Sequence, residues 1–260
     1  MNPAAAPHLS LVIPAFDEEQ RIEASLERIG AFLSSLGFAC EVVLVDDGSK
    51  PAGRAACERA IASLPPSIAR SLLRVEKNRG KGAAVRDGCL AATGEYVAYI
   101  DADLASPPED LVALIAALDT GAGVAVGVRN QLDGSDMRDA RPPLRRLAGR
   151  VYAIAMGLVL LPGVGDSQCP LKAFRRDAAQ RLFRLQRIQT WSFDAELLFL
   201  ASRLGLRVAK VPVRWHDVAG SHLRLDARSA LELLNLVRIR WLHRGVSKST
   251  LAVTEAPAIR

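Results

Sequence analysis

Cysteines are few in this chain, and they form no recognisable pattern. The 260 residues include four of them, and no two stand in a C-x-x-C pair. Structural zinc sites and disulfide scaffolds need cysteines at closely paired spacings, so this scatter argues against both. We expect reduced thiols, as in a cytosolic protein. The four residues are Cys40, Cys57, Cys89 and Cys169.

Long apolar runs are also missing. No stretch of about 18 consecutive apolar residues occurs, so no membrane-spanning helix is predicted. Residues 1–7 lack a basic region followed by an apolar core, so no signal peptide is expected. The most apolar segment, Val151 to Leu161, contains Gly157 and has the length of a buried or interfacial helix. We expect a cytoplasmic protein, either free or peripheral on the cytoplasmic face of a membrane.

Aromatic residues make up only 5% of the chain, although its net charge is +6. A basic protein can meet nucleic acid, an anionic membrane or a phosphorylated substrate. The arginines are concentrated after Val128 with few aromatics beside them. Neither an RNA-binding aromatic motif nor a helix-turn-helix pattern is found, so nucleic acid is not an expected partner.

Apolar runs typical of strands alternate with helical apolar spacing through the first half of the chain. Half of the residues are hydrophobic, which is enough for one large core. The alternation predicts an α/β fold, with a mostly parallel sheet flanked by helices on both faces. Neither a repeat nor a long linker is found, so we expect a single domain over residues 8–244 and a disordered tail at 245–260.

The bounds of these elements follow from the apolar spacing and from proline and glycine. The expected strands are Leu9–Ile13, Glu41–Val45, Ser71–Val75, Tyr96–Ile100, Gly123–Gly127 and Arg207–Val213. The expected helices are Glu18–Leu36, Arg54–Leu64, Lys81–Ala92, Leu144–Leu160, Phe193–Leu204 and Ala227–Arg244. A further helix is expected after Ser106, which can cap it, with proline in its first turn and Glu109 completing a capping box.

Two carboxylates with one residue between them follow the strand at 96–100. Side chains two apart in a strand point the same way, so Asp101 and Asp103 converge at the strand's carboxyl end. Open α/β sheets bind ligands there, and two hard oxygen donors suit a divalent cation shared with phosphates. Asp-x-Asp is a weak motif by itself, and an ordinary strand-end turn is the alternative interpretation.

Other charged clusters are expected at the same edge of the sheet. Acidic pairs at 17–18 and 46–47 follow the first and second strands, and three acidic clusters at one rim favour a ligand site. Residues 78–82, Asn-Arg-Gly-Lys-Gly, open a helix, where glycine N–H groups can approach a phosphate beside Lys81. A plain turn with a solvated Lys81 is the alternative, because the glycines complete neither a Rossmann nor a Walker motif.

Taken together, these motifs resemble the family 2 glycosyltransferases. The first half contributes residues 12–18, 43–49, 78–82 and 101–103. The second half contributes residues 166–172, which look like the family's D-[ST]-Q-C-G-x-K segment, followed in the same order by 191–196, 211–215 and 220–222. This order is most similar to dolichyl-phosphate β-glucosyltransferases, with the mannose synthases as close cousins. The match covers roughly residues 9–241.

The resemblance implies a GT-A-like (Rossmann-like) fold, with a nucleotide-binding half at 8–128 and an acceptor-side half at 129–244. It implies a metal-dependent, inverting hexosyltransferase, moving first of all glucose from UDP-glucose to a polyprenyl or dolichyl phosphate. Asp101 and Asp103 would bind Mg²⁺ or Mn²⁺, and Arg129 and Arg145 match positions that handle phosphates in the mannose synthases. The nucleotide sugar would meet Pro14, Phe16, Glu18, Val45, Asp47, Lys81, Asp101, Ala102 and Asp103.

The chain departs from its relatives' pattern at three positions. Ala105 stands where the mannose synthases place a Gln that binds the metal, so water would have to fill that position. Pro170 replaces the usual Gly, and His222 replaces the usual Lys after Gly-Ser. A neutral His carries less charge toward an anion than Lys, which puts a phosphate contact at His222 in doubt.

The acceptor decides which groups the chemistry needs. A lipid phosphate is largely anionic at pH 7, because its second pKa is about 6, and it needs cations such as the arginines at 145, 146 and 150. A hydroxyl acceptor needs a carboxylate base, and Asp166 and Asp194 are the candidates. The alternatives are a turn residue at Asp166 and a helix N-terminal charge at Asp194.

A prenyl phosphate acceptor also requires a membrane surface. The basic, amphipathic helix Ala227–Arg244 and the segment Val151–Leu161 either rest at that interface or pack on the sheet. Rival functions are transfer from GDP-mannose, transfer to a soluble hydroxyl, and nucleotide binding without turnover. The intact Asp101/Asp103 pair argues against the last of these. A dinucleotide oxidoreductase is least expected, because no glycine fingerprint follows the first strand.

Overall fold

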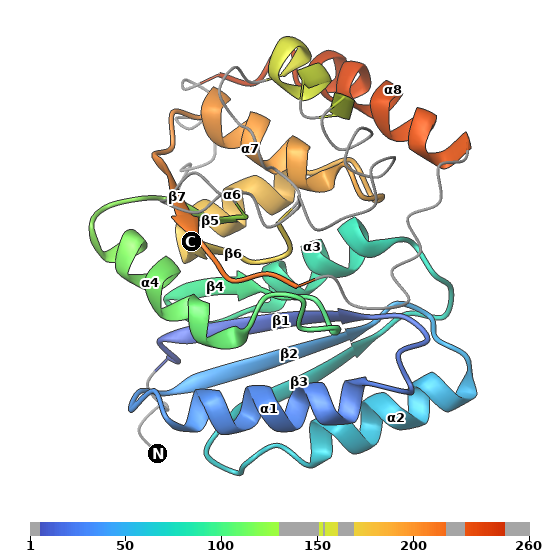
Figure 1. Cartoon of the computed structure of the whole chain (residues 1–260), viewed down its shortest axis with the longest axis vertical. Helices are drawn as coiled ribbons and strands as arrows, with labels where there is room; N and C mark the ends of the chain where they lie inside the picture. Colours follow the sequence, from blue (N-terminus) through green and yellow to red (C-terminus); the bar gives the residue numbers. More distant parts are fainter. Residues whose placement is uncertain (1–5, 130–150, 153, 161–168, 217–226, 248–260) are drawn as a thin grey trace, which may run out of the picture.

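A sheet of seven strands with helices on both faces forms the protein (Figure 1). The structure is a computed structural model that describes residues 6–129, 151–152, 154–160, 169–216 and 227–247. The strand order is β3-β2-β1-β4-β6-β5-β7. The predicted α/β class and the mostly parallel sheet are confirmed.

The elements lie close to the predicted bounds. The strands are β1 (Leu9–Ala15), β2 (Cys40–Asp46), β3 (Ala69–Arg74), β4 (Tyr96–Tyr99), β5 (Val124–Val128), β6 (Lys172–Arg175) and β7 (Val208–Pro212). The helices are α1 (Ile22–Ser34), α2 (Pro51–Ala62), α3 (Lys81–Ala91), the 3₁₀ turn η1 (Pro108–Asp110), α4 (Leu111–Asp119), α6 (Arg176–Leu185), α7 (Phe193–Arg203) and α8 (Ala227–Leu242). Residues 154–159 are also helical.

The first four strands run parallel, which brings their carboxyl ends to one edge. Strand β1 pairs with β2 on one side and with β4 on the other. Strands β1 and β2 are largely apolar on both faces, as expected for a sheet that is covered on both sides. The acidic residues that follow β1, β2 and β4 therefore share one rim.

Each face of the sheet carries its own hydrophobic core. On one face α1 packs with Ile22, Leu26 and Ile29, in a cluster that also includes residues of α2 and α4. On the other face α3, α6, α7 and α8 share a cluster that includes Phe193 and Ile239. Figure 1 shows α1 and α2 together below the sheet, with α6, α7 and α8 above it.

The pair β6 and α6 was not predicted. Strand β6 inserts antiparallel between β4 and β5, and it has only four residues. Its sequence, Lys-Ala-Phe-Arg, has a charge at each end, so it shows no apolar run. Helix α6 follows it without a connecting loop, so neither proline nor glycine separates the two elements.

One local prediction needs correction. Ser106 does not cap a helix: the first turn is η1, which Pro107 precedes in an extended conformation, and no side chain caps it. The hydroxyl of Ser106 is instead buried without a hydrogen-bond partner. Near the start of the predicted tail at 245–260, the carbonyl of Val246 accepts a 2.8 Å hydrogen bond from Arg203 Nε. Residues 248–260 lie outside the described part.

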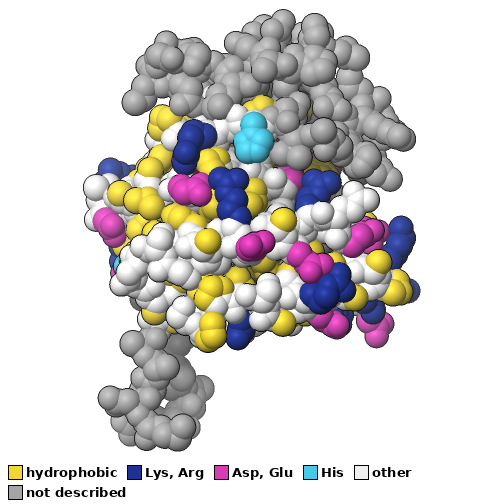
Figure 2. Space-filling model, turned by 60° about the horizontal axis from the view of Figure 1, so that its bottom comes forward, with side chains coloured by type: hydrophobic (Ala, Val, Ile, Leu, Met, Phe, Trp, Pro, Cys, Tyr) yellow, Lys and Arg dark blue, Asp and Glu magenta, His cyan; other side chains and the backbone are white. Residues whose placement is uncertain are grey.

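The surface in Figure 2 mixes charges of both signs with apolar side chains. Lysines and arginines alternate there with acidic residues and do not form one continuous basic patch on this face. In the part of the chain that the structure describes, no helix has both the length and the apolar character needed to cross a bilayer.

Candidate active site

The two aspartates of the 101–103 motif lie just beyond β4 and are held by different contacts. Both carboxylate oxygens of Asp101 lie within 2.8 Å of Lys81 Nζ, the first residue of α3. The carboxylate of Asp103 accepts the N–H of Ala105 at 3.1 Å. Ala102 between them is buried, and its carbonyl accepts the Ser25 hydroxyl at 2.6 Å. The motif is therefore anchored through its middle residue.

The electrostatics of this pair reflect burial and like charge. Burial raises the pKa of Asp101, and the nearby Asp103 raises it further, while Lys81 lowers it. Burial alone would lower the pKa of Lys81, but Asp101 and Asp194 outweigh it and raise that pKa. The pKa of Glu18 is raised by burial, and also by Asp103 and Asp101, so Glu18 belongs to the same cluster.

The donor set fits a divalent cation of the magnesium type. Oδ1 of Asp101 is buried and makes no hydrogen bond, although Lys81 Nζ lies 2.7 Å away. Hard oxygen donors of this kind suit Mg²⁺ or Mn²⁺, which commonly take one or two carboxylates and complete their shell with phosphates and water. No group of three acidic, His or Cys ligands occurs among the described residues. Ala105, buried at the expected third position, has no donor side chain.

The residues predicted for the nucleoside differ in what they expose. Phe16, just after β1, is 45% exposed, whereas Pro14 is half-buried. Val45 is fully buried in the core, so its side chain reaches no ligand and only its backbone is available. Asp47 is buried too, and burial raises its pKa. Its carboxylate accepts the N–H of Gly80 at 2.8 Å.

The glycine loop was predicted to offer N–H groups to a phosphate, and this is wrong for both glycines. The N–H of Gly80 is bound by Asp47, and that of Gly82 by the carbonyl of Gln189 at 2.8 Å. A Cβ at Gly80 (φ +101) would lie 2.6 Å from the same carbonyl, and one at Gly82 would lie 2.8 Å from Phe193 Cβ. The glycines allow close packing between two loops, and Lys81 is the group that faces the site.

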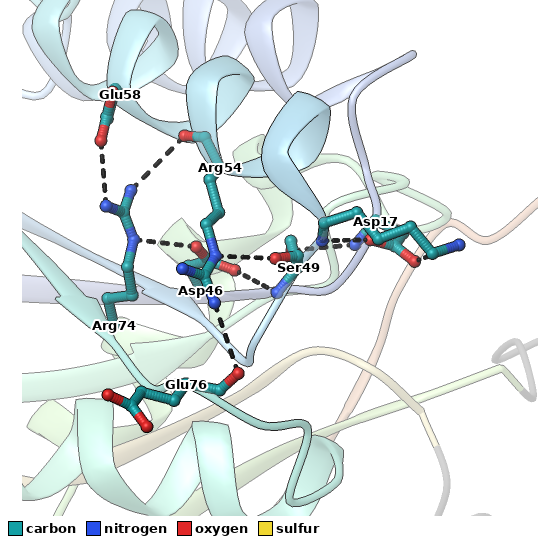
Figure 3. A network of polar contacts seen from close by, with 8 residues as sticks. Asp17, Asp46, Ser49, Arg54, Glu58, Arg74 and Glu76 are labelled. Atoms are coloured by element: carbon teal, nitrogen blue, oxygen red, sulfur yellow. Dashed lines mark hydrogen bonds and ion pairs between the residues drawn. The ribbon is translucent and has the colours of Figure 1, made fainter.

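Two acidic residues of the rim serve the loops that surround it (Figure 3). Asp46 accepts the N–H of Ser49 at 2.9 Å and pairs with Arg74 at 3.0 Å. Asp17 accepts the N–H of Lys50 at 2.8 Å, and its own N–H donates to the Ser49 hydroxyl. These two carboxylates therefore have structural partners, and in these two acidic pairs Glu18 and Asp47 remain the residues predicted to meet ligand.

A buried polar cluster that the sequence did not reveal lies near Asp101 and Lys81. Asp194, on α7, accepts hydrogen bonds from Lys172 Nζ at 2.5 Å and from the hydroxyl of Tyr99. Lys172 also donates to the carbonyl of Cys169 at 2.6 Å, and both charged residues are buried. The available signal in the sequence was a lysine flanked by apolar residues, with Leu171 before Lys172 and Ala173 after it.

Arg129 lies at the end of β5, next to the turn that follows Asp103. Its guanidinium is 5.5 Å from the ring centre of Trp215. The adjacent His216 donates its N–H to the carbonyl of Ala105 at 3.0 Å, which joins the two segments. The remaining predicted site residues, Arg145, Asp166 and His222, fall outside the described part of the chain.

Comparisons with known proteins find relatives over most of the chain. A dolichyl-phosphate beta-glucosyltransferase of Dictyostelium discoideum is 34% identical over 251 residues, covering 92% of this chain and 76% of the relative. The human protein of that name is 30% identical over 248 residues, covering 90% and 76%.

A solved structure shares the fold. It is glucosyl-3-phosphoglycerate synthase from Mycobacterium tuberculosis in complex with Mn²⁺, UDP and glucosyl-3-phosphoglycerate. It has a TM-score of 0.63 and 21% identity, and covers 90% of this chain and 81% of its own. The expected GT-A-like fold is therefore confirmed. The family model described as "Glycosyl transferase family 2" matches residues 10–183. The chain belongs to glycosyl transferase family 2.

Proposed function

We propose that the protein transfers glucose from UDP-glucose to a polyprenyl phosphate in a metal-dependent, inverting reaction. One observation carries this proposal: Asp101 and Asp103 lie at the carboxyl end of β4 in a chain similar to dolichyl-phosphate beta-glucosyltransferases over about nine-tenths of its length. The likeness extends beyond the nucleotide-binding half, which supports a shared acceptor as well as a shared donor.

The donor would bind across the carboxyl ends of β1, β2 and β4. Asp101 and Asp103 would hold Mg²⁺ or Mn²⁺, which when bound neutralises charge on the diphosphate as a Lewis acid. Phe16 offers an exposed ring and Glu18 a carboxylate for the nucleoside. Asp47 positions this side indirectly, because it fixes the loop that carries Lys81.

The acceptor chemistry is supported by the state of the candidate base. Asp194 is buried and already accepts two hydrogen bonds, which does not suit proton removal from a hydroxyl substrate. A phosphate nucleophile needs no base, since its second pKa is about 6. It needs cations to position it, and Arg129 and Arg145 are our candidates. Asp166 remains the candidate base for a hydroxyl acceptor.

In-line attack on an α-linked donor inverts the anomeric centre, so the proposed product is a β-linked glycosyl phospholipid. The coupling constant of the anomeric proton reports this configuration directly. An α-linked product in the NMR spectrum would exclude the direct displacement.

Two helical segments support the proposal that the protein associates with a membrane surface. Residues 154–159 and α8 approach each other where Arg240 donates to the carbonyl of Val159 at 2.9 Å. Each buries one side, with Met156 and Ile239 in the core. The other sides form an outer apolar face, with Leu158 82% and Trp241 62% exposed. Its members are Ile154, Leu158, Leu234, Val237 and Trp241, with exposed arginines at 238, 240 and 244 beside them.

The transfer assay for this proposal uses a panel of labelled donors. The protein is incubated with Mn²⁺, polyprenyl phosphate and labelled UDP-glucose, GDP-mannose or UDP-galactose, and label is counted in the organic phase. We expect transfer from UDP-glucose, loss of transfer with EDTA, and a loss of at least a hundredfold in Asp103→Ala. Preferred transfer from GDP-mannose would replace the donor assignment. Full activity of Asp103→Ala would refute the metal assignment.

A further inference from the structure

Lys81 is an internal cation that contacts a carboxylate predicted to hold a metal ion. Its Nζ lies 2.7 Å from Oδ1 and 2.8 Å from Oδ2 of Asp101, so one ammonium spans both oxygens. The ring of Trp191 covers this ammonium from another side, with its centre 4.8 Å away. An ion bound to either oxygen would therefore lie next to a positive charge.

The backbone of Lys81 is fixed, which leaves its side chain as the movable part. Gly80 and Gly82 on either side of it are bound to Asp47 and Gln189. The side chain of Gln186 adds a 2.8 Å hydrogen bond to the carbonyl of Gly82. The covering ring of Trp191 is 57% exposed, so the ammonium is held on one side by a carboxylate and on the other by a surface side chain.

We propose that the Lys81 ammonium exchanges one anionic partner for another. Before the donor binds it pairs with Asp101; when a metal ion binds that carboxylate, the ammonium moves to the diphosphate of the donor. This inference rests on the proposed function and adds an order to it. The ion alone has to displace Lys81 and therefore binds weakly. A diphosphate offers the displaced ammonium a new anion, so the ion and the nucleotide favour each other's binding through Lys81.

The test measures binding without any transfer, so it can fail independently of the proposed acceptor. Mn²⁺ binding to chelator-treated protein is titrated by electron paramagnetic resonance without nucleotide. Lys81→Met should bind Mn²⁺ at least about tenfold more tightly than the wild type, because the competing ammonium is gone. The matched control is Lys50→Met, which removes an exposed lysine paired with Asp17 at 3.3 Å and should change nothing.

A second titration tests the transfer of charge to the diphosphate. UDP binding in the presence of saturating Mn²⁺, followed by calorimetry, should weaken about tenfold in Lys81→Met and stay unchanged in Lys50→Met. A far-ultraviolet circular dichroism spectrum verifies that each variant is folded, and Lys81→Gln serves if the Met variant is not. Unchanged or weaker Mn²⁺ binding in the folded variant overturns the exchange, and so does unchanged UDP binding. If Lys81→Met shows both changes in binding but the wild-type protein transfers no glucose to the lipid, only the proposed acceptor is rejected.

Discussion

At the scale of single residues, the buried ion pair between Lys172 and Asp194 is the main interaction that supports the candidate site from the interior. Both side chains are buried, so water cannot replace the contact if one partner is removed. The pKa of Tyr99, which donates to the same carboxylate, is raised well above its usual value by burial and by Asp194. The hydroxyl therefore stays protonated and remains a donor throughout the ordinary pH range.

Removing one partner of this pair should cost much stability. We expect Asp194→Asn to lower the free energy of unfolding by about 3–5 kcal/mol, because Lys172 is left as an uncompensated buried charge. Urea unfolding followed by circular dichroism measures this. Lys172→Met in the same chain should recover part of the loss. Arg28→Met, which breaks the exposed pair with Glu109, is the control and should change little.

A loss below about 1 kcal/mol in Asp194→Asn would contradict the structural role of the pair. A strong loss of transfer with unchanged stability would then favour Asp194 as a base.

Prediction of single site residues from the sequence was limited where the structure depends on turns or on contacts between distant elements. Asp101 and Asp103 lie beyond the last residue of β4, and Asp103 is in a turn, so the strand alternation from which their convergence was predicted does not extend to them. Lys172 and Asp194 come from different elements, and only the insertion of β6 beside β4 brings them together. The burial of Val45 was missed for a similar reason, because α3 packs on the strand that carries it.

At the scale of elements, the contact between the start of α3 and the loop before α7 determines where Lys81 lies. We expect Gly82→Ala to weaken UDP binding at least about tenfold and to destabilise the fold by about 1–3 kcal/mol, because the new Cβ would press on Phe193 and Gln189. Calorimetry with UDP and urea unfolding measure the two effects.

Gly157→Ala is the matched control for this substitution. A Cβ there meets nothing within 4 Å, and the residue lies in a helical segment. It should leave UDP binding unchanged and stabilise the protein by up to about 1 kcal/mol, since Ala favours helix over Gly. Equal behaviour of the two variants would show that the loop contact does not position Lys81.

Most elements were predictable because apolar spacing and flanking glycine or proline mark them. Helix α3 begins at Lys81 as predicted, and α7 begins at Phe193. Strand β6 escaped because it is short and has charged ends, and α2 begins earlier than predicted because Pro51 occupies its first turn. The local pattern of β6 was weak and its neighbouring strands determine it, whereas Pro51 is a local signal for the start of α2 that the prediction did not use.

At the scale of the whole molecule, the outer apolar face and its arginines should bind an anionic membrane. We expect sedimentation with vesicles containing phosphatidylglycerol, and a decrease as salt rises. Trp241→Ser and Leu158→Ser should each weaken binding roughly tenfold, because each removes a large apolar side chain. Val112→Ser, which changes an exposed valine on α4, is the control and should bind as the wild type does.

Binding that ignores both salt and these substitutions would assign the outer apolar face to packing or to another role. The fold class and the ordering of the motifs were predictable on this scale, whereas the outward orientation of the apolar residues was not. Amphipathic spacing predicts a helix with two faces but does not say which face meets the core, and here the three-dimensional packing of Ile239 and Met156 decides it.

The central claim is that the nucleophile is a lipid phosphate that needs no base. The most direct measurement compares polyprenyl phosphate with the unphosphorylated polyprenol of the same chain length, under the same metal and labelled UDP-glucose. The account predicts label in the organic phase with the phosphate and none above background with the alcohol. Transfer to the alcohol at a comparable rate would contradict it.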